Sequence, residues 1–165
     1  MKFNLANKVA IITGGGSGIG KAISKTLAQQ GALVHILELN LENAKETKLE
    51  IENEGGRAVI HQCNVAVQQD VKSTIARIAE KDSIDILINN AGVAHVGTIE
   101  NTLEEDFDRV YSVNVKGAYN CIFAVIPNMK KRGGVILNMA SVASSVAVSD
   151  RFAYSVSKEI GRAHV

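Results

Sequence analysis

Short apolar runs rich in β-branched residues alternate with longer amphipathic stretches along this chain. The first run, Val9–Thr13, ends in a glycine cluster, and residues 19–30 follow with apolar side chains at four-residue intervals. This pattern predicts a strand, a tight turn and a helix. The same alternation predicts strands over residues 33–37, 58–61, 84–89 and 135–139. It also predicts helices over residues 41–54 and 68–81, and a helix that begins near Phe152. Residues 104–131 are predicted to form one or two helices, with Pro127 bending or ending the stretch.

Strands separated by helices require crossover connections, which make the sheet parallel and cover both of its faces. The 165 residues are one domain's worth, and 46% are hydrophobic against 21% charged, so the chain can bury a core. We therefore expect an α/β fold with a doubly wound parallel sheet, of the Rossmann type, formed by residues 1–158.

Composition and charge exclude several classes of function. Lys and Arg number 18 and Asp and Glu 17, without a block of like charge, so neither nucleic acid nor a membrane is an expected partner. No apolar stretch is long enough to span a membrane and no export leader is recognisable, so we expect a cytoplasmic protein. Cys63 and Cys121 are interpreted as buried thiols rather than a disulfide or a reactive thiol. His35 and His61 lack a metal-ligand spacing with them, so no metal is expected.

The turn after the first strand reads TGGGSGIG. Glycines let the backbone approach a pyrophosphate closely, and the helix that follows presents free N–H groups and a partial positive charge. A glycine cluster can be a plain turn, but between a strand and a helix it favours a dinucleotide site. The candidate cofactor-binding residues in this turn are Thr13, Gly14, Gly16, Ser17, Gly18, Ile19 and Gly20.

Glu38 follows the second predicted strand. A carboxylate at this point can accept hydrogen bonds from the adenosine ribose hydroxyls and would repel a 2′-phosphate. No Lys or Arg lies within residues 37–41 or in the glycine turn. We therefore expect NAD as the cofactor, with NADP the less favoured alternative. The alternative interpretation of Glu38 is a solvated acid at the end of a strand, with no role in binding.

Tyr154 and Lys158 lie four residues apart near the end of the chain. On a helix this spacing puts both side chains on one face. A cation next to a phenol favours the phenolate, which lets tyrosine exchange a proton near neutral pH. Taken alone, the spacing occurs by chance in many helices.

Five motifs in order resemble the short-chain dehydrogenase/reductase family. They are TGGGSGIG at 13–20, NNAG at 89–92, Asn114, Ser141, and YSVSK at 154–158, so the resemblance covers nearly the whole chain. It implies an NAD(P)-dependent oxidoreductase. Because the motifs stand in the expected strand and helix contexts, the ordered set outweighs the ordinary interpretation of each residue.

The resemblance also implies a role for each matching residue. Tyr154 would exchange a proton with the substrate oxygen, and Lys158 would lower the Tyr154 pKa and hold the nicotinamide ribose. Ser141 would hydrogen-bond the same substrate oxygen, and Asn114 would hold a water that connects Lys158 to solvent. Asn90, Ala91 and Gly92 would border the cofactor.

One position departs from the family pattern, and one residue suggests a substrate class. Many members have Asp-Val after the third strand to bind the adenine edge. Here Asn64 and Val65 would bind it, with a carboxamide that can still hydrogen-bond there but lacks the charge. Arg151, three residues before Tyr154, could hold an anionic substrate group, or it could be a surface arginine paired with Asp150. The surrounding residues resemble family members that oxidise short hydroxy acids or sugar acids, such as 3-hydroxybutyrate dehydrogenases.

Family members continue past the catalytic lysine with further strands, but here only EIGRAHV follows Lys158. These residues back-translate to a common sequencing adapter, so we expect residues 159–165 to be a non-native tail; a natural short C-terminus is the alternative. The domain would then be incomplete, with its C-terminal strands missing, and this fragment itself inactive. The full-length parent would be a homo-oligomer, a dimer or tetramer.

Together these features predict an oxidoreductase that moves hydride between NAD(H) and a small-molecule secondary alcohol or ketone, for example a short hydroxy acid or sugar acid. The alternative is a non-catalytic dinucleotide-binding sensor or scaffold on the same fold.

Overall fold

The computed structural model describes residues 4–146 and 148–159. Most of the predicted non-native tail, residues 160–165, lies outside this described part.

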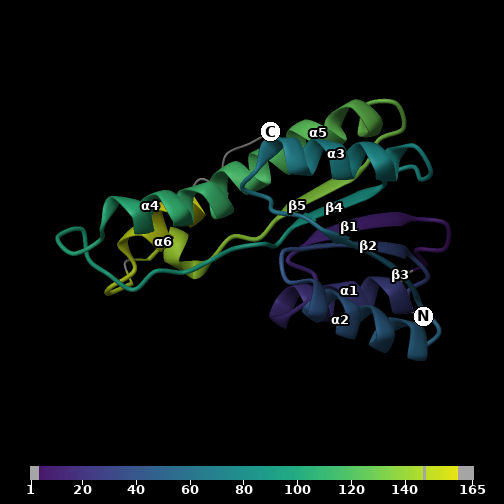
Figure 1. Cartoon of the computed structure of the whole chain (residues 1–165), viewed down its shortest axis with the longest axis horizontal. Coiled ribbons are helices and arrows are strands. Elements are labelled where there is room, and N and C mark those ends of the chain that lie inside the picture. Colours follow the sequence, from purple (N-terminus) through teal and green to yellow (C-terminus); the bar gives the residue numbers. More distant parts are fainter. Residues whose placement is uncertain (1–3, 147, 160–165) are drawn as a thin grey trace.

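Five parallel strands form one sheet in the order β3-β2-β1-β4-β5 (Figure 1). The strands are β1 (Val9–Thr13), β2 (Leu33–Glu38), β3 (Arg57–Gln62), β4 (Ile86–Asn89) and β5 (Val135–Asn138). From β1 the chain adds strands on one side as far as β3, and then crosses back to add β4 and β5 on the other side. The order therefore reverses between β1 and β4, which is the switch point where doubly wound folds bind ligands.

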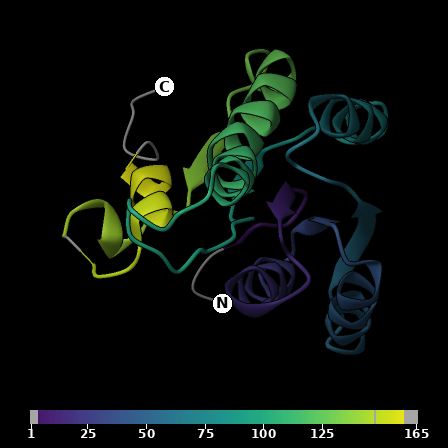
Figure 2. The same ribbon diagram turned by 60° about the vertical axis from the view of Figure 1, so that its left-hand side comes forward.

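Helices cover both faces of this sheet (Figure 1). Helices α1 (Gly18–Gln29) and α2 (Leu41–Asn53) lie on one face, and α3 (Gln68–Ala79) and α5 (Gly117–Met129) lie on the other. Helix α4 (Glu104–Tyr111) extends beyond the sheet, and α6 (Phe152–Glu159) packs beside it in both ribbon views (Figure 2). The predicted doubly wound α/β fold is confirmed.

Successive residues of the central strand serve two separate hydrophobic cores. Ile11 belongs to the core beneath α3 and α5, with Leu87 and Val125, whereas Ile12 belongs to the core beneath α1 and α2, with Ile36. Every residue of β1 is buried, as expected for a strand in a sheet covered on both faces. Both cysteines are free, buried thiols, as predicted.

The helical stretch 104–131 differs in detail from the prediction. It consists of α4, a π-helical turn over Ser112–Lys116, and α5. Pro127 lies inside α5, which continues to Met129. Proline removes one backbone donor and its ring crowds the carbonyl four residues earlier, but the last turn of α5 still forms, so Pro127 does not end the helix. The π turn was not predicted, because its i→i+5 hydrogen bond leaves no pattern in hydropathy.

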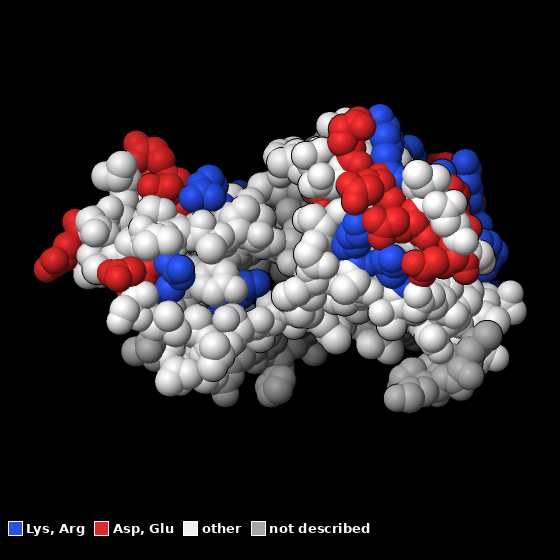
Figure 3. All heavy atoms as spheres, turned by 90° about the horizontal axis from the view of Figure 1, so that it is seen from below, with Lys and Arg blue, Asp and Glu red and all other residues white. Residues whose placement is uncertain are grey.

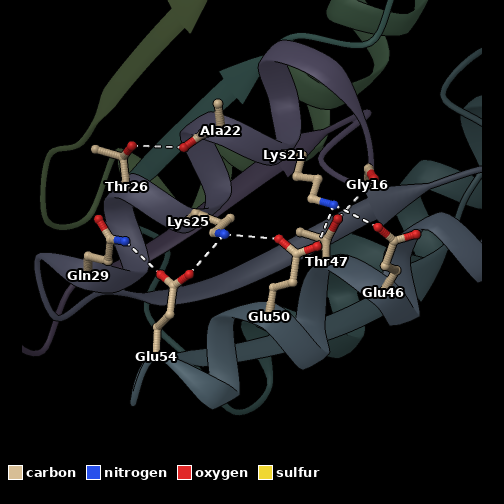
Figure 4. Close-up of polar contacts among 10 residues, drawn as sticks. All are labelled: Gly16, Lys21, Ala22, Lys25, Thr26, Gln29, Glu46, Thr47, Glu50 and Glu54. Carbon is tan, nitrogen blue, oxygen red and sulfur yellow. Dashed lines mark hydrogen bonds and ion pairs between the residues drawn. The ribbon is translucent and has the colours of Figure 1, made fainter.

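An ion-pair network joins α1 to α2 (Figure 4). Lys21 contacts Glu46 at 2.8 Å and Glu50 at 2.7 Å, and Lys25 contacts Glu50 and Glu54, each at 2.9 Å. The two ammonium groups, first Lys21 and then Lys25, lower the pKa of Glu50 to about 2. Charged side chains of both signs gather on the side of the molecule that carries these helices (Figure 3). Each pair is exposed enough for solvent screening, so the network mainly fixes how the two helices meet.

None of the helices described in residues 4–146 and 148–159 is long and apolar enough to cross a membrane.

Candidate active site

The glycine turn brings the start of α1 close to the end of β1. Gly14 and Gly18 have positive φ angles of 61° and 49°, which side chains disfavour. A Cβ atom at Gly20 would overlap the carbonyl oxygen of Gly14, so only glycine allows this approach. The N-terminus of α1, where the extended Ser17 is the N-cap residue but makes no side-chain capping bond, thus opens onto the turn and can face an anion.

Side chains from two neighbouring elements hold this turn in shape. The Gly16 N–H donates to Glu38 Oε2 at 3.1 Å. Thr47 Oγ1 donates to the Gly16 carbonyl at 2.9 Å (Figure 4). Thr47 is fully buried on α2. A Cβ atom at Gly16 would lie 2.9 Å from Glu38 Cγ and 3.0 Å from the Asn43 carbonyl carbon, so α2 packs directly on the turn.

Thr13 and Asn90 connect the ends of β1 and β4 at the switch point. Thr13 Oγ1 accepts hydrogen bonds from the N–H groups of Asn90 at 3.0 Å and Ala91 at 2.9 Å. In return, Asn90 Nδ2 donates to the carbonyls of Thr13 at 3.0 Å and Gly14 at 3.2 Å. These two predicted cofactor residues therefore also fix the position of the turn relative to β4.

A cavity of about 420 Å³ opens at the carboxyl ends of the strands. Its walls include ten of the predicted cofactor residues: Gly14, Ser17, Gly18, Ile19, Glu38, Asn64, Val65, Asn90, Ala91 and Gly92. The other five are absent from its lining: Thr13, Gly16 and Gly20 shape the turn behind it, and Tyr154 and Lys158, also predicted to contact the cofactor, lie outside it. Both carboxylate oxygens of Glu38 accept backbone N–H groups, Oε1 that of Asn40 at 3.2 Å and Oε2 that of Gly16.

A second cavity of about 220 Å³ adjoins the first, because the two share Ile19, Asn90, Gly92 and Val93 as lining residues. Tyr154 and Lys158 from α6 line this smaller cavity, together with Ala94, Met139 and Ala140. The structure thus brings the predicted catalytic pair to the space next to the glycine turn.

The pair has the geometry that its spacing predicts. Lys158 Nζ lies 5.8 Å from the centroid of the Tyr154 ring and donates to the Met139 carbonyl at 3.0 Å. Lys158 is only 9% exposed, and this burial lowers the pKa of its ammonium. The lysine is therefore held by the end of β5 and is easier to deprotonate than a surface lysine.

Asn114 lies in the π turn and fastens α6 to the loop after β4. Its Nδ2 donates to the Val93 carbonyl at 2.9 Å and to Ser157 Oγ at 2.8 Å, and its Oδ1 accepts from the Val93 N–H at 2.8 Å. Its side chain therefore bridges a residue that lines both cavities and the residue before Lys158. The expected role of Asn114 in holding a water stays a prediction.

Ser141 and Arg151 lie outside the lining of both cavities. Ser141 caps the short 3₁₀ turn Val142–Ser144, and its Oγ accepts from the Ala143 N–H at 3.2 Å. The Arg151 guanidinium donates to the backbone carbonyl of Asp150 at 3.1 Å. The substrate roles of both residues stay predictions.

Within the described residues, no group of three or more His, Cys, Asp or Glu side chains could hold a metal ion.

A family model described as short chain dehydrogenase matches residues 8–163. The chain belongs to the short-chain dehydrogenase family. An uncharacterized oxidoreductase of Thermotoga maritima is 43% identical over 158 residues, which cover 94% of this chain and 62% of the relative. The chain therefore spans less than two thirds of that relative's length.

Solved structures resemble this short-chain dehydrogenase closely. An NAD⁺-bound xylitol dehydrogenase superposes with a TM-score of 0.90 at 31% identity, covering 96% of this chain and 62% of that one. A metagenomic short-chain oxidoreductase in complex with NADP gives a TM-score of 0.89 at 31% identity, covering 93% of this chain and 71% of that one. The two neighbours thus carry different nicotinamide cofactors.

Three residues that support the site of this short-chain dehydrogenase were not predicted. Thr47 bonds the glycine turn, Ser157 bonds Asn114, and the buried Asn120 donates from α5 to the Val65 carbonyl at 2.9 Å. Ser157 lies within the YSVSK motif, so its sequence position was a usable indication. Thr47 and Asn120 sit in helices where a polar residue normally faces solvent, so nothing in the sequence marked them.

Proposed function

We propose that this short-chain dehydrogenase transfers hydride between NAD(H) and a secondary alcohol or ketone. The observation that carries the proposal is the adjacency of two cavities, one walled by the glycine turn and Glu38, the other by Tyr154 and Lys158. A dinucleotide lying across the switch point would have its phosphates at the turn and its reactive ring beside the tyrosine.

The residues fit a dinucleotide. The open space beside Gly18, where a Cβ atom would meet nothing within 4 Å, leaves room for a phosphate at the α1 N-terminus. Glu38 favours NAD, because its carboxylate would bind ribose hydroxyls and repel a 2′-phosphate. Lys21, the cation nearest in sequence to the turn, is engaged by Glu46 and Glu50 and so does not compensate for the charge of Glu38.

Tyr154 would move the proton of the substrate oxygen. When bound, the nicotinamide supplies or accepts the hydride. In the reducing direction the Tyr154 hydroxyl would donate its proton to the ketone oxygen. In the oxidising direction the Tyr154 phenolate, stabilised by the nearby Lys158 ammonium, would take the proton from the alcohol. Ser141 would hydrogen-bond the same oxygen, and Asn114 would connect Lys158 to solvent through a water.

The substrate class is a small hydroxylated molecule, with a short hydroxy acid or sugar acid as our preferred candidate. Arg151 would hold its carboxylate from the strand-like segment that pairs with Gly97. The name of the xylitol dehydrogenase neighbour supports a small polyhydroxylated substrate in general. We further propose that the full-length protein is a cytoplasmic dimer or tetramer.

The test is NAD-linked turnover of the full-length gene product on a panel of hydroxy acids, sugar acids and neutral alcohols. Tyr154→Phe should abolish turnover and leave NAD binding unchanged, because it removes only the hydroxyl. Tyr119→Phe, at an exposed tyrosine on α5, is the matched control and should keep full activity. NAD binding without turnover of any substrate would instead favour a non-catalytic dinucleotide sensor.

A further inference from the structure

The loop after β4 is tied to the backbone that leads into α6, the helix of Tyr154. The Gly97 N–H donates to the Asp150 carbonyl at 3.0 Å, and the Phe152 N–H donates to the Gly97 carbonyl at 3.1 Å. These bonds form a parallel bridge between Gly97 and Arg151. Asp150 has a φ angle of 55°, which residues other than glycine rarely adopt, so this backbone needs the support. Because Phe152 opens α6, the place of Gly97 bears directly on the place of Tyr154.

Gly97 is buried and enclosed by three polar side chains. A Cβ atom there would lie 2.6 Å from His95 Nε2 and 2.9 Å from both Asn101 Oδ1 and Thr102 Oγ1. Two of these side chains are bonded within the loop itself. Asn101 Oδ1 accepts from the Thr98 N–H at 2.7 Å, and Thr102 Oγ1 donates to the Thr98 carbonyl at 2.6 Å.

The third side chain, His95, joins the loop to α4. It is 15% exposed, and its Nδ1 lies 3.5 Å from Asp106 Oδ1 in the first turn of α4. A lone pair on Nδ1 would face this carboxylate, so we place the N–H of the ring on Nδ1. The same Asp106 oxygen accepts from Arg109 Nη2 at 3.3 Å. Helix α4 is a firm support for α6, because the rings of Phe107 and Phe152 stack between the two helices with centroids 6.1 Å apart.

The other ring nitrogen of His95 shows that packing does not account for a histidine here. Nε2 is buried and has no hydrogen-bond partner among the described residues. An unpaired buried polar atom opposes folding, and a leucine of similar size would fill the space without one. What a leucine could not supply is the contact of Nδ1 with Asp106.

The same loop forms part of the smaller cavity, since residues 93–94, immediately before His95, line it beside Tyr154. We propose that His95 is a positioning residue for proton transfer, an inference that rests on the proposed function. Its contact with Asp106 holds Gly97 in place, and the bridge from Gly97 then keeps the start of α6 where Tyr154 can reach the substrate oxygen.

The experiment compares two replacements of His95 in the full-length gene product. His95→Asn keeps an N–H group close to the position of Nδ1 but fills less space. His95→Leu fills the space but has no donor. Arg109→Ala, which removes the other contact of the same Asp106 oxygen, is the matched control.

Three quantities are measured for each variant. The first two are kcat on the best substrate of the panel and the dissociation constant of NAD. The third is the rate of hydrogen exchange at the Gly97 and Phe152 N–H groups, which form the bridge. The Ala91 N–H, bonded to Thr13 Oγ1 at the other end of the loop, is the internal reference.

We expect His95→Leu to lower kcat about tenfold and to speed exchange at Gly97 and Phe152, because Tyr154 is displaced from its working position. His95→Asn should keep most of the wild-type kcat and Arg109→Ala all of it, with the NAD dissociation constant unchanged in every variant. A wild-type kcat or unchanged exchange in His95→Leu, or an equal loss of kcat in both His95 variants, would overturn the inference alone. If the wild type turns over no substrate, the proposed function fails and the inference with it.

Discussion

A histidine pair on neighbouring strands of the sheet should make the folded state sensitive to mild acid. His35 on β2 and His61 on β3 are joined by a hydrogen bond of 2.9 Å between His35 Nδ1 and His61 Nε2. His35 Nε2 faces the carboxylate of Asp82 at 3.4 Å. An unprotonated His35 Nε2 would point its lone pair at this carboxylate, so we place the His35 proton on Nε2. His35 Nδ1 is then the acceptor, and His61 Nε2–H donates to it. The pair is thus a neutral unit in the fold.

Burial opposes a further proton on either ring. It lowers the pKa of His35, which is 3% exposed, although Asp82 acts in the opposite direction. Burial, followed by the proximity of His35 and of Arg77, lowers the pKa of His61 from 6.5 to about 4. Below about pH 6.5 the unfolded chain binds a proton that the folded chain does not. Stability is therefore complete above this pH and is lost as the pH falls toward 4.

The size of the effect follows from the pKa shift of His61. A shift from 6.5 to about 4 corresponds to at most roughly 3 kcal/mol. Solvent reaches part of the His61 ring and screens it, so we expect a loss of about 1–2 kcal/mol between pH 7.5 and 5. Glu50 contributes little in this window, because its stabilising charge is lost only at lower pH, as the pH falls from 4.5 toward its folded pKa of about 2.

Urea unfolding at pH 7.5 and pH 5 measures this loss directly. His61→Gln, which cannot take up the proton, should lose less free energy of unfolding than the wild type over the same interval. Gln62→Ala, on the same strand but outside the pair, should retain the wild-type dependence. An equally steep loss in His61→Gln would show that the pair is not the group responsible.

Two further predictions concern the glycine turn. Gly20→Ala should abolish dinucleotide binding, because its Cβ would overlap the Gly14 carbonyl. Gly55→Ala, at a positive-φ glycine outside the site with open space around it, should cost only about 1–2 kcal/mol of stability and leave binding unchanged; calorimetry and urea unfolding compare the two variants. Thr47→Val should weaken NAD binding severalfold, because the Gly16 carbonyl in the turn loses its hydrogen bond. Thr26→Val removes a similar hydroxyl–carbonyl bond at an exposed position of α1 and should leave the NAD dissociation constant unchanged.

The parts of the fold that follow from local patterns could be predicted from the sequence. The run VAIIT gives β1, whose residues are all buried, and the glycine turn after it opens α1 as expected. Strand β4 starts later than predicted, at Ile86, because the Ile84 N–H bonds the Asn128 side chain instead of a neighbouring strand. Such a boundary depends on a partner 44 residues away and is invisible to hydropathy.

The site could be predicted where a residue acts through its own chemistry, and less well where it acts through a distant partner. Tyr154, Lys158 and Glu38, which line the two cavities, were predicted because a phenol, an ammonium and a carboxylate at those spacings suit proton transfer and ribose binding. Asn114 was found through family resemblance, but its bonds to Val93 and Ser157 could not be anticipated. They arise from the π turn and from the packing of α6, which are properties of the tertiary structure.

The two halves of the site depend on different contacts. The larger cavity, the proposed dinucleotide site, is walled by the ends of β1 to β4 and by α1, which the sheet and its two cores hold in place. Lys158 is held to the rest of the site by its bond to the Met139 carbonyl, and the helix that carries it is held by the Asn114–Ser157 bond. Loss of the Asn114–Ser157 bond should therefore shift the predicted catalytic pair while the larger cavity keeps its shape, so we expect mutation to separate the proposed cofactor binding from turnover.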